Sequence, residues 1–226
     1  MISFQNITKK YFSDIVALDN ISFDVEEKEF VAIVGKSGAG KTTLLKLFLR
    51  EEAVSSGKIF FKGEDIHRMK KRCIPLLRRR VGVIFQDYKL LKSKTVYENI
   101  AYALEILGAD KETVKNDVSY VLDIVNLKKQ ANNFPDQLSG GEKQRTAIAR
   151  ALIHRPEVII ADEPTGNLDP YHTRDIIELL KKINEFGTII ILSTHDKEII
   201  NNLEKRVITL EQGRLVKDEK KGRFIL

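Results

Sequence analysis

One eight-residue stretch near the start of the chain constrains its fold more than any other part of the sequence. Residues 35–42 are Gly-Lys-Ser-Gly-Ala-Gly-Lys-Thr and match the full pattern G-x-x-x-x-G-K-[ST] of a phosphate-binding loop. A continuous apolar run, Phe30–Val34, precedes the loop, and a helical pattern follows it from Lys41 to about Arg50. A strand, a glycine loop and a helix in this order predict an α/β nucleotide-binding fold rather than an ordinary glycine turn.

The chemistry of this loop follows from its backbone. Glycines let successive N–H groups turn towards phosphate oxygens, and the following helix points its positive end at the same place. We expect Lys41 to reach the β and γ phosphates, as a binding and catalytic residue, and the Thr42 hydroxyl to ligate Mg²⁺. The predicted nucleotide contacts here are Gly35, Lys36, Ser37, Gly38, Ala39, Gly40, Lys41, Thr42 and Thr43.

Length and composition limit the kind of protein that carries this loop. The chain has 226 residues, 42% hydrophobic and 31% charged, as expected for a globular domain with a sizeable core. Its net charge of +6 permits an anionic ligand or a membrane surface and requires neither. No apolar run is long enough to span a bilayer, and the first residues show no signal peptide. The single cysteine, Cys73, excludes an internal disulfide and predicts a cytosolic protein in which Cys73 fills apolar space.

Hydrophobic periodicity divides the chain into an α/β core and a helical insertion. Strands are predicted at 2–8, 15–25, 30–34, 58–61, 81–85, 158–161 and 188–192, with a terminal hairpin at 207–216. Helices are predicted at 41–50, 67–79, 96–107, 111–125, 139–153 and 170–187. Thr95 with Glu98 has the form of a capping box before the helix at 96–107, and Asp169 followed by Pro170 is the expected N-cap of the helix at 170–187. We therefore predict one domain, 1–226, with a mainly parallel core sheet and N-terminal antiparallel strands built from 1–87 and 156–226. Residues 88–155 form the predicted helical subdomain.

Two acidic residues follow the strand predicted at 158–161. In a parallel sheet this is the ligand-binding edge, so we expect Asp162 to hold Mg²⁺ and Glu163 to polarise the attacking water. Two solvated loop carboxylates are the alternative, which the phosphate loop makes less favoured.

A second anion site is predicted at Ser139-Gly140-Gly141-Glu142. Ser139 and Glu142 have capping-box spacing, and the two glycines leave backbone N–H groups bare at a helix start. One nucleotide does not need two such sites in one chain, so we expect this one to serve a nucleotide bound to another copy. A plain capped helix is the alternative.

Three further side chains complete the predicted constellation. Gln86 follows the strand at 81–85, where its amide can touch Mg²⁺ or water, and His195 follows the strand at 188–192, where its ring can donate to the γ phosphate. Tyr11 precedes the second strand and can stack on adenine. Each residue taken alone is more often structural; their position at one sheet edge favours function for Gln86 and His195.

The order of these motifs resembles the ATP-binding subunits of ABC systems over essentially the whole chain. This resemblance implies a head-to-tail pair of subunits, in which each ATP lies between one phosphate loop and the partner's Ser139–Gly141. It also implies that Asp169 crosses the interface beside the active site, and that ATP binding closes the pair while hydrolysis loosens it.

A narrower resemblance is carried by Val83–Leu91, Thr95–Ile100, Gly38–Gly40 with Thr42–Leu47, and Arg78–Gly82. These segments are similar to bacterial cell-division ATPases of the FtsE type, which implies the membrane partner FtsX, a place on the inner face of the cell membrane, and control of cell-wall hydrolases. The segment Thr165–Pro170 is shared with lipoprotein-releasing and macrolide-export ATPases, which remain the alternative. The family receives its partner's cytoplasmic helix near Tyr88–Tyr97.

Other classes fit less well. A soluble nucleic-acid or translation ABC protein usually carries two cassettes or a long coiled coil, and this chain lacks a concentrated aromatic–basic patch. A phosphate-loop kinase would not explain the Ser139–Glu142 motif. The basic residues at Lys70–Arg72 and Arg78–Arg80 face either lipid head groups or solvent, and the sequence does not decide between them.

Overall fold

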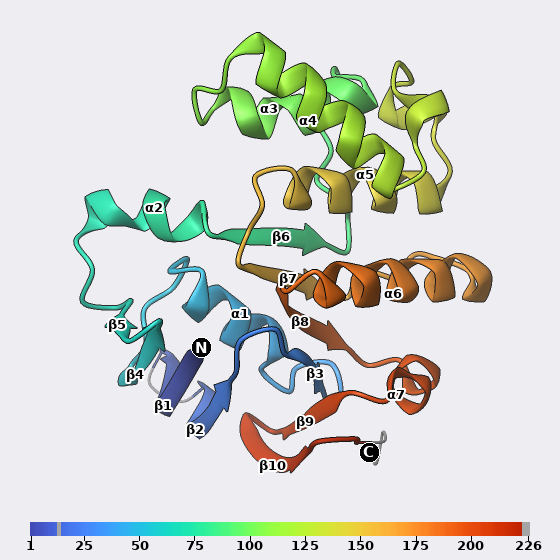
Figure 1. Ribbon diagram of the computed structural model, residues 1–226. Helices are drawn as coiled ribbons and strands as arrows, with labels where there is room; N and C mark the ends of the chain where they lie inside the picture. The colour runs from blue at the N-terminus through green and yellow to red at the C-terminus, as the bar shows by residue number, and fades with distance from the viewer. Residues whose placement is uncertain (13–14, 223–226) are drawn as a thin grey trace.

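The computed structural model describes residues 1–12 and 15–222, which form a six-stranded sheet, a four-stranded sheet and helices packed on both. Figure 1 shows the helices α3, α4 and α5 stacked in a layer beyond strand β6, with both sheets on the other side of that strand. Within the described residues, no helix is both long and apolar enough to cross a membrane.

The six-stranded sheet carries the phosphate-binding loop. Its order is β10-β9-β3-β8-β7-β6, and all neighbours pair in parallel except β9 and β10. The strands are β3 (Phe30–Val34), β6 (Val81–Phe85), β7 (Val158–Asp162), β8 (Ile189–Thr194), β9 (Arg206–Glu211) and β10 (Arg214–Glu219). Every residue of β3 and β8 is buried, which accounts for their continuous apolar sequences and confirms the predicted mainly parallel core.

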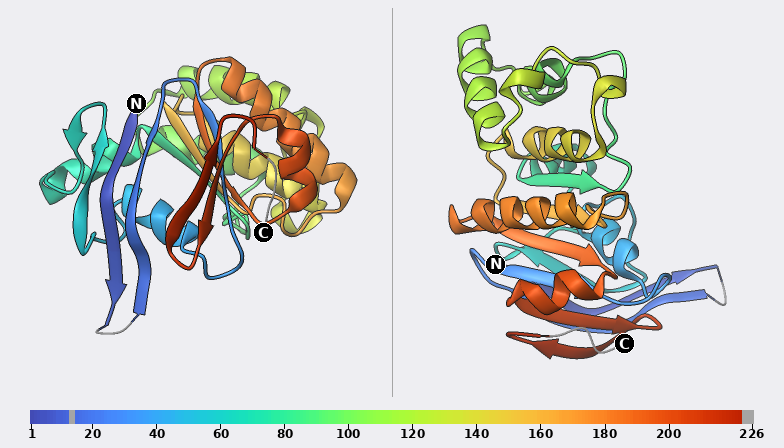
Figure 2. Two further views of the ribbon diagram at one scale, coloured as in Figure 1. Left: turned by 90° about the horizontal axis from the view of Figure 1, so that it is seen from below. Right: turned by 90° about the vertical axis from the view of Figure 1, so that its right-hand side faces the viewer.

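A separate antiparallel sheet has the order β2-β1-β4-β5. Its strands are β1 (Ile2–Tyr11), β2 (Ile15–Val25), β4 (Ser56–Phe61) and the short β5 (Glu64–Asp65). Figure 2 shows the β1–β2 hairpin extending beyond the rest of the fold. Helix α1 (Lys41–Phe48) joins the two sheets, because its buried residues Leu44 and Phe48 belong to one apolar cluster with strands of both.

The residues between β6 and β7 are helical, as predicted. They form α3 (Val96–Glu105), α4 (Lys111–Ile124) and α5 (Gly140–Leu152), with the short 3₁₀ turns η2 (Lys128–Gln130) and η3 (Pro135–Gln137). Thr95 with Glu98 and Ser139 with Glu142 make the expected capping boxes at the starts of α3 and α5. Local sequence therefore fixes where these helices begin.

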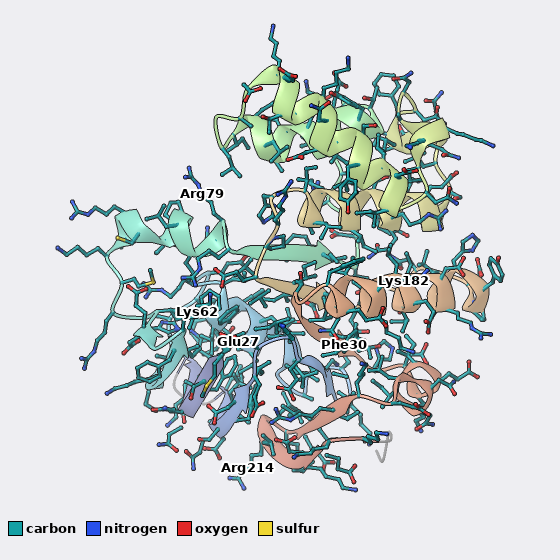
Figure 3. All side chains as sticks on the ribbon, viewed as in Figure 1. Glu27, Phe30, Lys62, Arg79, Lys182 and Arg214 are labelled. Carbon is teal, nitrogen blue, oxygen red and sulfur yellow. The ribbon has the colours of Figure 1, made fainter. Side chains whose placement is uncertain are left out.

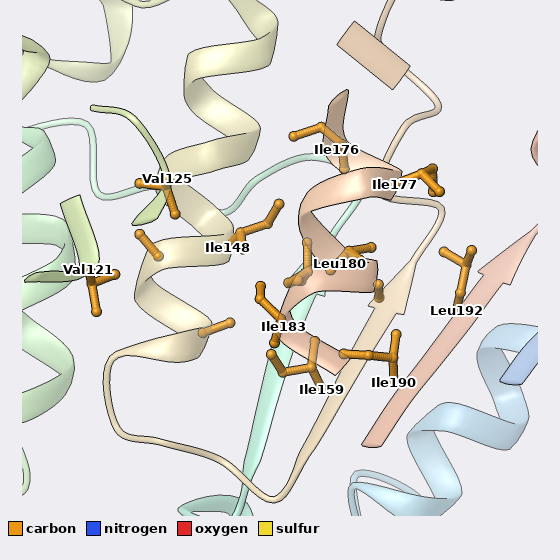
Figure 4. Packing of buried hydrophobic residues seen from close by; sticks show 14 of the residues in the cluster. Val121, Val125, Ile148, Ile159, Ile176, Ile177, Leu180, Ile183, Ile190 and Leu192 are labelled. Carbon is orange, nitrogen blue, oxygen red and sulfur yellow. The ribbon is translucent and has the colours of Figure 1, made fainter. Parts of the chain in front are cut away.

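Helix α6 (Pro170–Glu185) packs its apolar face on the parallel sheet, and Asp169 caps its first turn. Figure 4 shows part of the cluster around it, which contains Val121, Val125, Ile148, Ile159, Ile176, Leu180, Ile183 and Ile190. The cluster runs without a break from the sheet through α5 into α4. Packed side chains thus cross the boundary between the α/β core and residues 88–155. The division of the chain into a core and a helical subdomain stays a prediction.

Two elements differ from the sequence prediction. A helix predicted over 67–79 is reduced to a 3₁₀ turn, η1 (Lys71–Cys73), and the short α2 (Ile74–Arg78), because Lys70 is extended and Pro75 occupies the first turn. A short helix, α7 (Lys197–Leu203), was not predicted; Asp196 caps it directly after β8. Cys73 lies partly buried at the start of α2 rather than in the core.

The segment between β6 and α3 is held by two side chains of the helical layer. The Asn99 side chain, fully buried, accepts from the Leu91 N–H at 2.8 Å and donates to the carbonyls of Leu91, Lys94 and Thr95 at 3.1, 3.0 and 2.9 Å. The Arg150 guanidinium donates to the carbonyls of Lys89 and, at 2.9 Å, of Tyr88. The segment is therefore a fixed loop, although it has no regular secondary structure.

We expect Asn99→Ala to destabilise the protein by about 2–4 kcal/mol, because it leaves the Leu91 N–H and several carbonyls without the buried amide that binds them. Urea unfolding measures this. The same substitution at Asn116, exposed on α4, should change the free energy of unfolding by less than about 0.5 kcal/mol. A cost at Asn99 no greater than at Asn116 would show that the loop does not need this anchor.

Candidate functional site

The phosphate-binding loop lies at the carboxyl end of β3, and its geometry leaves backbone donors bare. Gly40 caps α1 with a φ of +102°, which glycine adopts without strain, and no side chain caps the helix. The first N–H groups of α1 therefore lack side-chain acceptors in the described part of the chain, and an anion is the natural partner at such a helix start.

Lys41 folds back onto this loop. Its ammonium donates to the carbonyl of Gly35 at 2.7 Å and of Lys36 at 3.4 Å, and it lies 3.5 Å from Oε1 of Glu163. The side chain is only 8% exposed. A buried positive charge is thus already balanced against the carboxylate that the sequence predicts as the general base.

Asp162 and Thr42 come together at the end of β7. The Thr42 hydroxyl donates to Oδ2 of Asp162 at 2.9 Å, whereas Oδ1 of Asp162 is buried without a hydrogen-bond partner among the described residues. A carboxylate oxygen with unused acceptor capacity beside a hydroxyl is the oxygen donor set that Mg²⁺ prefers. These two residues therefore fit the predicted metal.

Glu163 is fixed by its backbone as well as its side chain. Its φ is +48°, an uncommon value for a non-glycine residue, and its N–H donates to the Ser193 carbonyl of β8 at 2.9 Å. Its Oε1 lies 2.9 Å from Nδ1 of His195. Lys41, Glu163 and His195 thus form one contact chain, although its two ends, Lys41 and His195, are more than 150 residues apart in sequence.

Gln86 reaches the same region from β6. Its carbonyl accepts from the Asn167 amide at 3.0 Å, and its side-chain amide packs on Gly166, where an added Cβ would lie 2.7 Å from Nε2. The loop that follows Glu163 is therefore in direct contact with the end of β6. A groove of about 580 Å³ runs from Glu163 and Gly166 along α6 to His195.

The second predicted anion site is a separate place on the chain. Ser139 Oγ accepts from the Glu142 N–H at 3.3 Å, and the Glu142 carboxylate accepts from the Ser139 N–H and hydroxyl at 2.8 Å each, which holds the pKa of Glu142 below its usual value. Among the described residues, no hydrogen bond or ion pair joins 139–142 to 35–43.

The Asp169 loop lies directly against this helix start. A Cβ on Gly141 would come 2.5 Å from the His172 ring, so only glycine permits this approach. His172 in turn contacts the Asp169 carboxylate, which also accepts from the His172 N–H at 3.0 Å. These backbone and side-chain hydrogen bonds hold the pKa of Asp169 below its usual value. His172 carries no sequence pattern that would have predicted this role.

Tyr11 is held in place by two residues that the sequence prediction missed. Its hydroxyl donates to the Glu52 carboxylate and also contacts Thr43 of α1. Lys9 lies 3.2 Å from Glu52 and 4.8 Å from the centre of the Tyr11 ring. Burial and the Glu52 contact raise the pKa of Tyr11; burial opposes ionisation of Glu52, but hydrogen bonds from Tyr11 and Lys9 hold its pKa below the usual value.

Comparison with known proteins shows which family the chain resembles. The family model described as ABC transporter matches residues 18–166. The chain is 50% identical to the cell division ATP-binding protein FtsE of Streptococcus pneumoniae, over 99% of this chain and 97% of that one. It is 47% identical to the protein of the same name from Bacillus subtilis, over 99% and 98%.

A solved structure gives the same result for the fold. The ATP-binding cassette MJ0796, described as dimeric in a post-hydrolysis state with ADP and phosphate bound, has a TM-score of 0.88 and 33% identity. The match covers 99% of this chain and 100% of that one. These matches confirm the predicted fold class and the predicted resemblance.

Proposed function

The chain belongs to the ABC transporter family of ATP-binding ATPases, and we propose that it drives a cell-division membrane complex of the FtsE type. The observation that carries the proposal is the contact chain Lys41–Glu163–His195 beside the Thr42–Asp162 pair. It supplies a cation for phosphate, a base beside the point of attack, and an oxygen site for a metal at one sheet edge.

In the proposed mechanism the bare N–H groups of the loop and the Lys41 ammonium bind the β and γ phosphates. Lys41 exchanges its carbonyl contacts and its ion pair with Glu163 for phosphate oxygens, which frees Glu163 to accept a proton from water. His195, already 2.9 Å from Glu163, orients that carboxylate and can donate to the γ phosphate. Thr42 and Asp162, with Gln86, would hold Mg²⁺, which neutralises charge on the phosphates when bound.

The complete site is proposed to need a second copy of the chain. The helix start at Ser139 offers an anion site separate from the phosphate loop, and Ser139, which is exposed, belongs to the capping box that fixes this helix start. The contact of His172 with Gly141 and with Asp169 links this helix start to the loop that carries Asp169. MJ0796, described as dimeric, is the precedent for a paired cassette.

The proposed membrane partner is an FtsX-like protein that controls cell-wall hydrolysis from the inner face of the membrane. The relatives' names, cell division ATP-binding protein FtsE, support the role in cell division. The docking segment, residues 87–97, begins directly after Gln86 and is held by hydrogen bonds to Asn99 and Arg150. A displacement of Gln86 at the γ phosphate would therefore move the docking segment with it. A lipoprotein-releasing or drug-export complex remains the alternative, and the membrane protein that co-purifies with the chain decides between them.

We expect Glu163→Gln to lower ATP turnover by about 10²- to 10⁴-fold while ATP binding persists, because the amide cannot accept the proton of water. The trapped ATP state should also convert the chain to a dimer. Phosphate release and size-exclusion chromatography with ATP measure the two effects.

Glu185→Gln, the same substitution at an exposed position near the end of α6, is the control and should leave both readouts unchanged. If the turnover of Glu163→Gln lies within tenfold of the parent, Glu163 is not the general base. If Glu163→Gln loses turnover but forms no dimer with ATP, Glu163 remains the proposed base, and the proposal that two copies share the ATP site is contradicted.

We expect Glu52→Gln to weaken ATP binding by about tenfold, because Tyr11 loses the charged acceptor that orients its ring as the adenine platform. Binding of tripolyphosphate, which lacks the base, should not change. Competition titration with both ligands measures the difference, with Glu51→Gln, at an exposed neighbouring position, as the control. An equal loss for both ligands would assign Glu52 to the phosphate loop instead.

We expect Leu90→Glu with Leu91→Glu to abolish co-purification of the membrane partner while the variant still binds ATP with parental affinity. Leu91 is 37% exposed and Leu90 is partly exposed, so charges there enter an apolar docking surface without filling the core. Tyr120→Glu with Phe186→Glu, both at exposed apolar positions, is the matched control. If the partner still binds the Leu90 and Leu91 variant, docking lies elsewhere.

A further inference from the structure

The positive charge of this protein is concentrated in one short segment. Residues 67–80 contain seven lysines and arginines and no acidic residue, whereas the whole chain has 38 basic and 32 acidic residues. The remaining residues therefore hold 31 basic against 32 acidic side chains, a net charge of −1. We name residues 67–80 the basic arm; it accounts for more than the entire +6 of the chain.

The basic arm lies at the periphery of the fold. It runs from β5 through η1 and α2 to the start of β6 (Figures 1 and 2). Leu77, only 2% exposed, anchors it in the core, and the Arg78 guanidinium donates to the Leu49 carbonyl at 3.1 Å. Arg80 is bound to Glu157 at 2.6 Å. One face of the arm is thus fixed to the rest of the fold by Leu77, Arg78 and Arg80.

The outer side of the arm carries cationic side chains that have no partner among the described residues. Lys70, Lys71, Arg72 and Arg79 are exposed, and within the described part of the chain their side chains make no hydrogen bond or ion pair. Figure 3 shows the Arg79 side chain pointing away from the ribbon. Leu76, 54% exposed, lies among them. Unpaired cations around an exposed leucine are the arrangement of a surface that meets an anionic, partly apolar partner.

We propose that the basic arm binds the anionic phospholipid surface of a membrane directly. This inference rests on the proposed function only in placing the protein beside a bilayer. Each lysine or arginine near an anionic bilayer contributes about 1 kcal/mol, so four free cations give a useful but reversible contact. Leu76 is positioned to enter the boundary between head groups and acyl chains.

Two observations favour lipid over nucleic acid as the partner. The arm contains no phenylalanine, tyrosine or tryptophan, and its one histidine, His67, is half-buried with a buried Nε2, so it lacks the large exposed rings on which proteins stack bases. It also adjoins the proposed membrane-facing surface, because β6, the edge strand of its sheet, leads from the arm to Gln86 and the docking segment. Five strand residues span about 17 Å, so both contacts can meet one bilayer.

Flotation of the full-length protein with vesicles tests the proposal. Vesicles of phosphatidylcholine with 30% or so phosphatidylglycerol should bind the chain, and binding should fall steeply as salt rises because the Debye length shrinks from about 10 Å at 0.1 M. Vesicles of phosphatidylcholine alone should not bind it. The triple variant Lys70→Gln, Lys71→Gln, Arg72→Gln should lose about one hundredfold in partitioning.

The matched control is Lys111→Gln, Lys115→Gln, Lys129→Gln, which removes the same charge from exposed positions on the helical layer. It should bind as the parent does, and unchanged ATP binding should show that both triple variants fold. Equal loss in the two variants, no binding by the parent, or tighter binding of single-stranded DNA than of vesicles would each overturn the proposal. None of these outcomes bears on ATP turnover, so the proposed function is judged separately.

Discussion

Parallel pairing of β6, β7, β8 and β3 is the constraint on which the candidate site depends. In this register Phe85 pairs with Asp162, Asp162 with Ser193, and Val34 with Thr194. The residues immediately after these strands are Gln86, Glu163, His195 and the phosphate-binding loop. Because parallel strands end at one edge, four segments far apart in sequence deliver their polar side chains to a single place.

The electrostatics of that edge are set before any ligand arrives. Lys41 is nearly buried, and its charge is balanced by two carbonyls and by Glu163. Glu163 has a left-handed backbone that its hydrogen bond to β8 helps to hold. A polyphosphate that replaces these contacts of Lys41 would therefore change the partners of the proposed catalytic carboxylate, which connects binding to catalysis through one ion pair.

Strand β6 connects the candidate site to the docking segment at one end and to the basic arm at the other. Its carboxyl end carries Gln86, which packs on the loop after Glu163, and the following segment is fixed to the helical layer by Asn99 and Arg150. Its amino end leads back to the basic arm. A displacement of this edge strand thus reaches both surfaces that we propose to face a membrane, because Ile84 packs in the apolar cluster of the helical layer and Val81 belongs, with Leu77 of the arm, to a second apolar cluster.

The sequence alone determined the features that depend on neighbours along the chain. The phosphate loop, the buried strands, the capping boxes at Thr95 and Ser139, and the Asp169 cap were all predicted, because hydrogen bonds within a few residues specify them. Only the tertiary structure decided how Tyr11 is held by Glu52, 41 residues away, and how His172 packs on Gly141. It also reduced the helix predicted at 67–79 to a 3₁₀ turn and a short α-helix, and it left Lys70, Lys71, Arg72 and Arg79 exposed. Such contacts depend on which segments the sheet brings together, and no local pattern of residues encodes that.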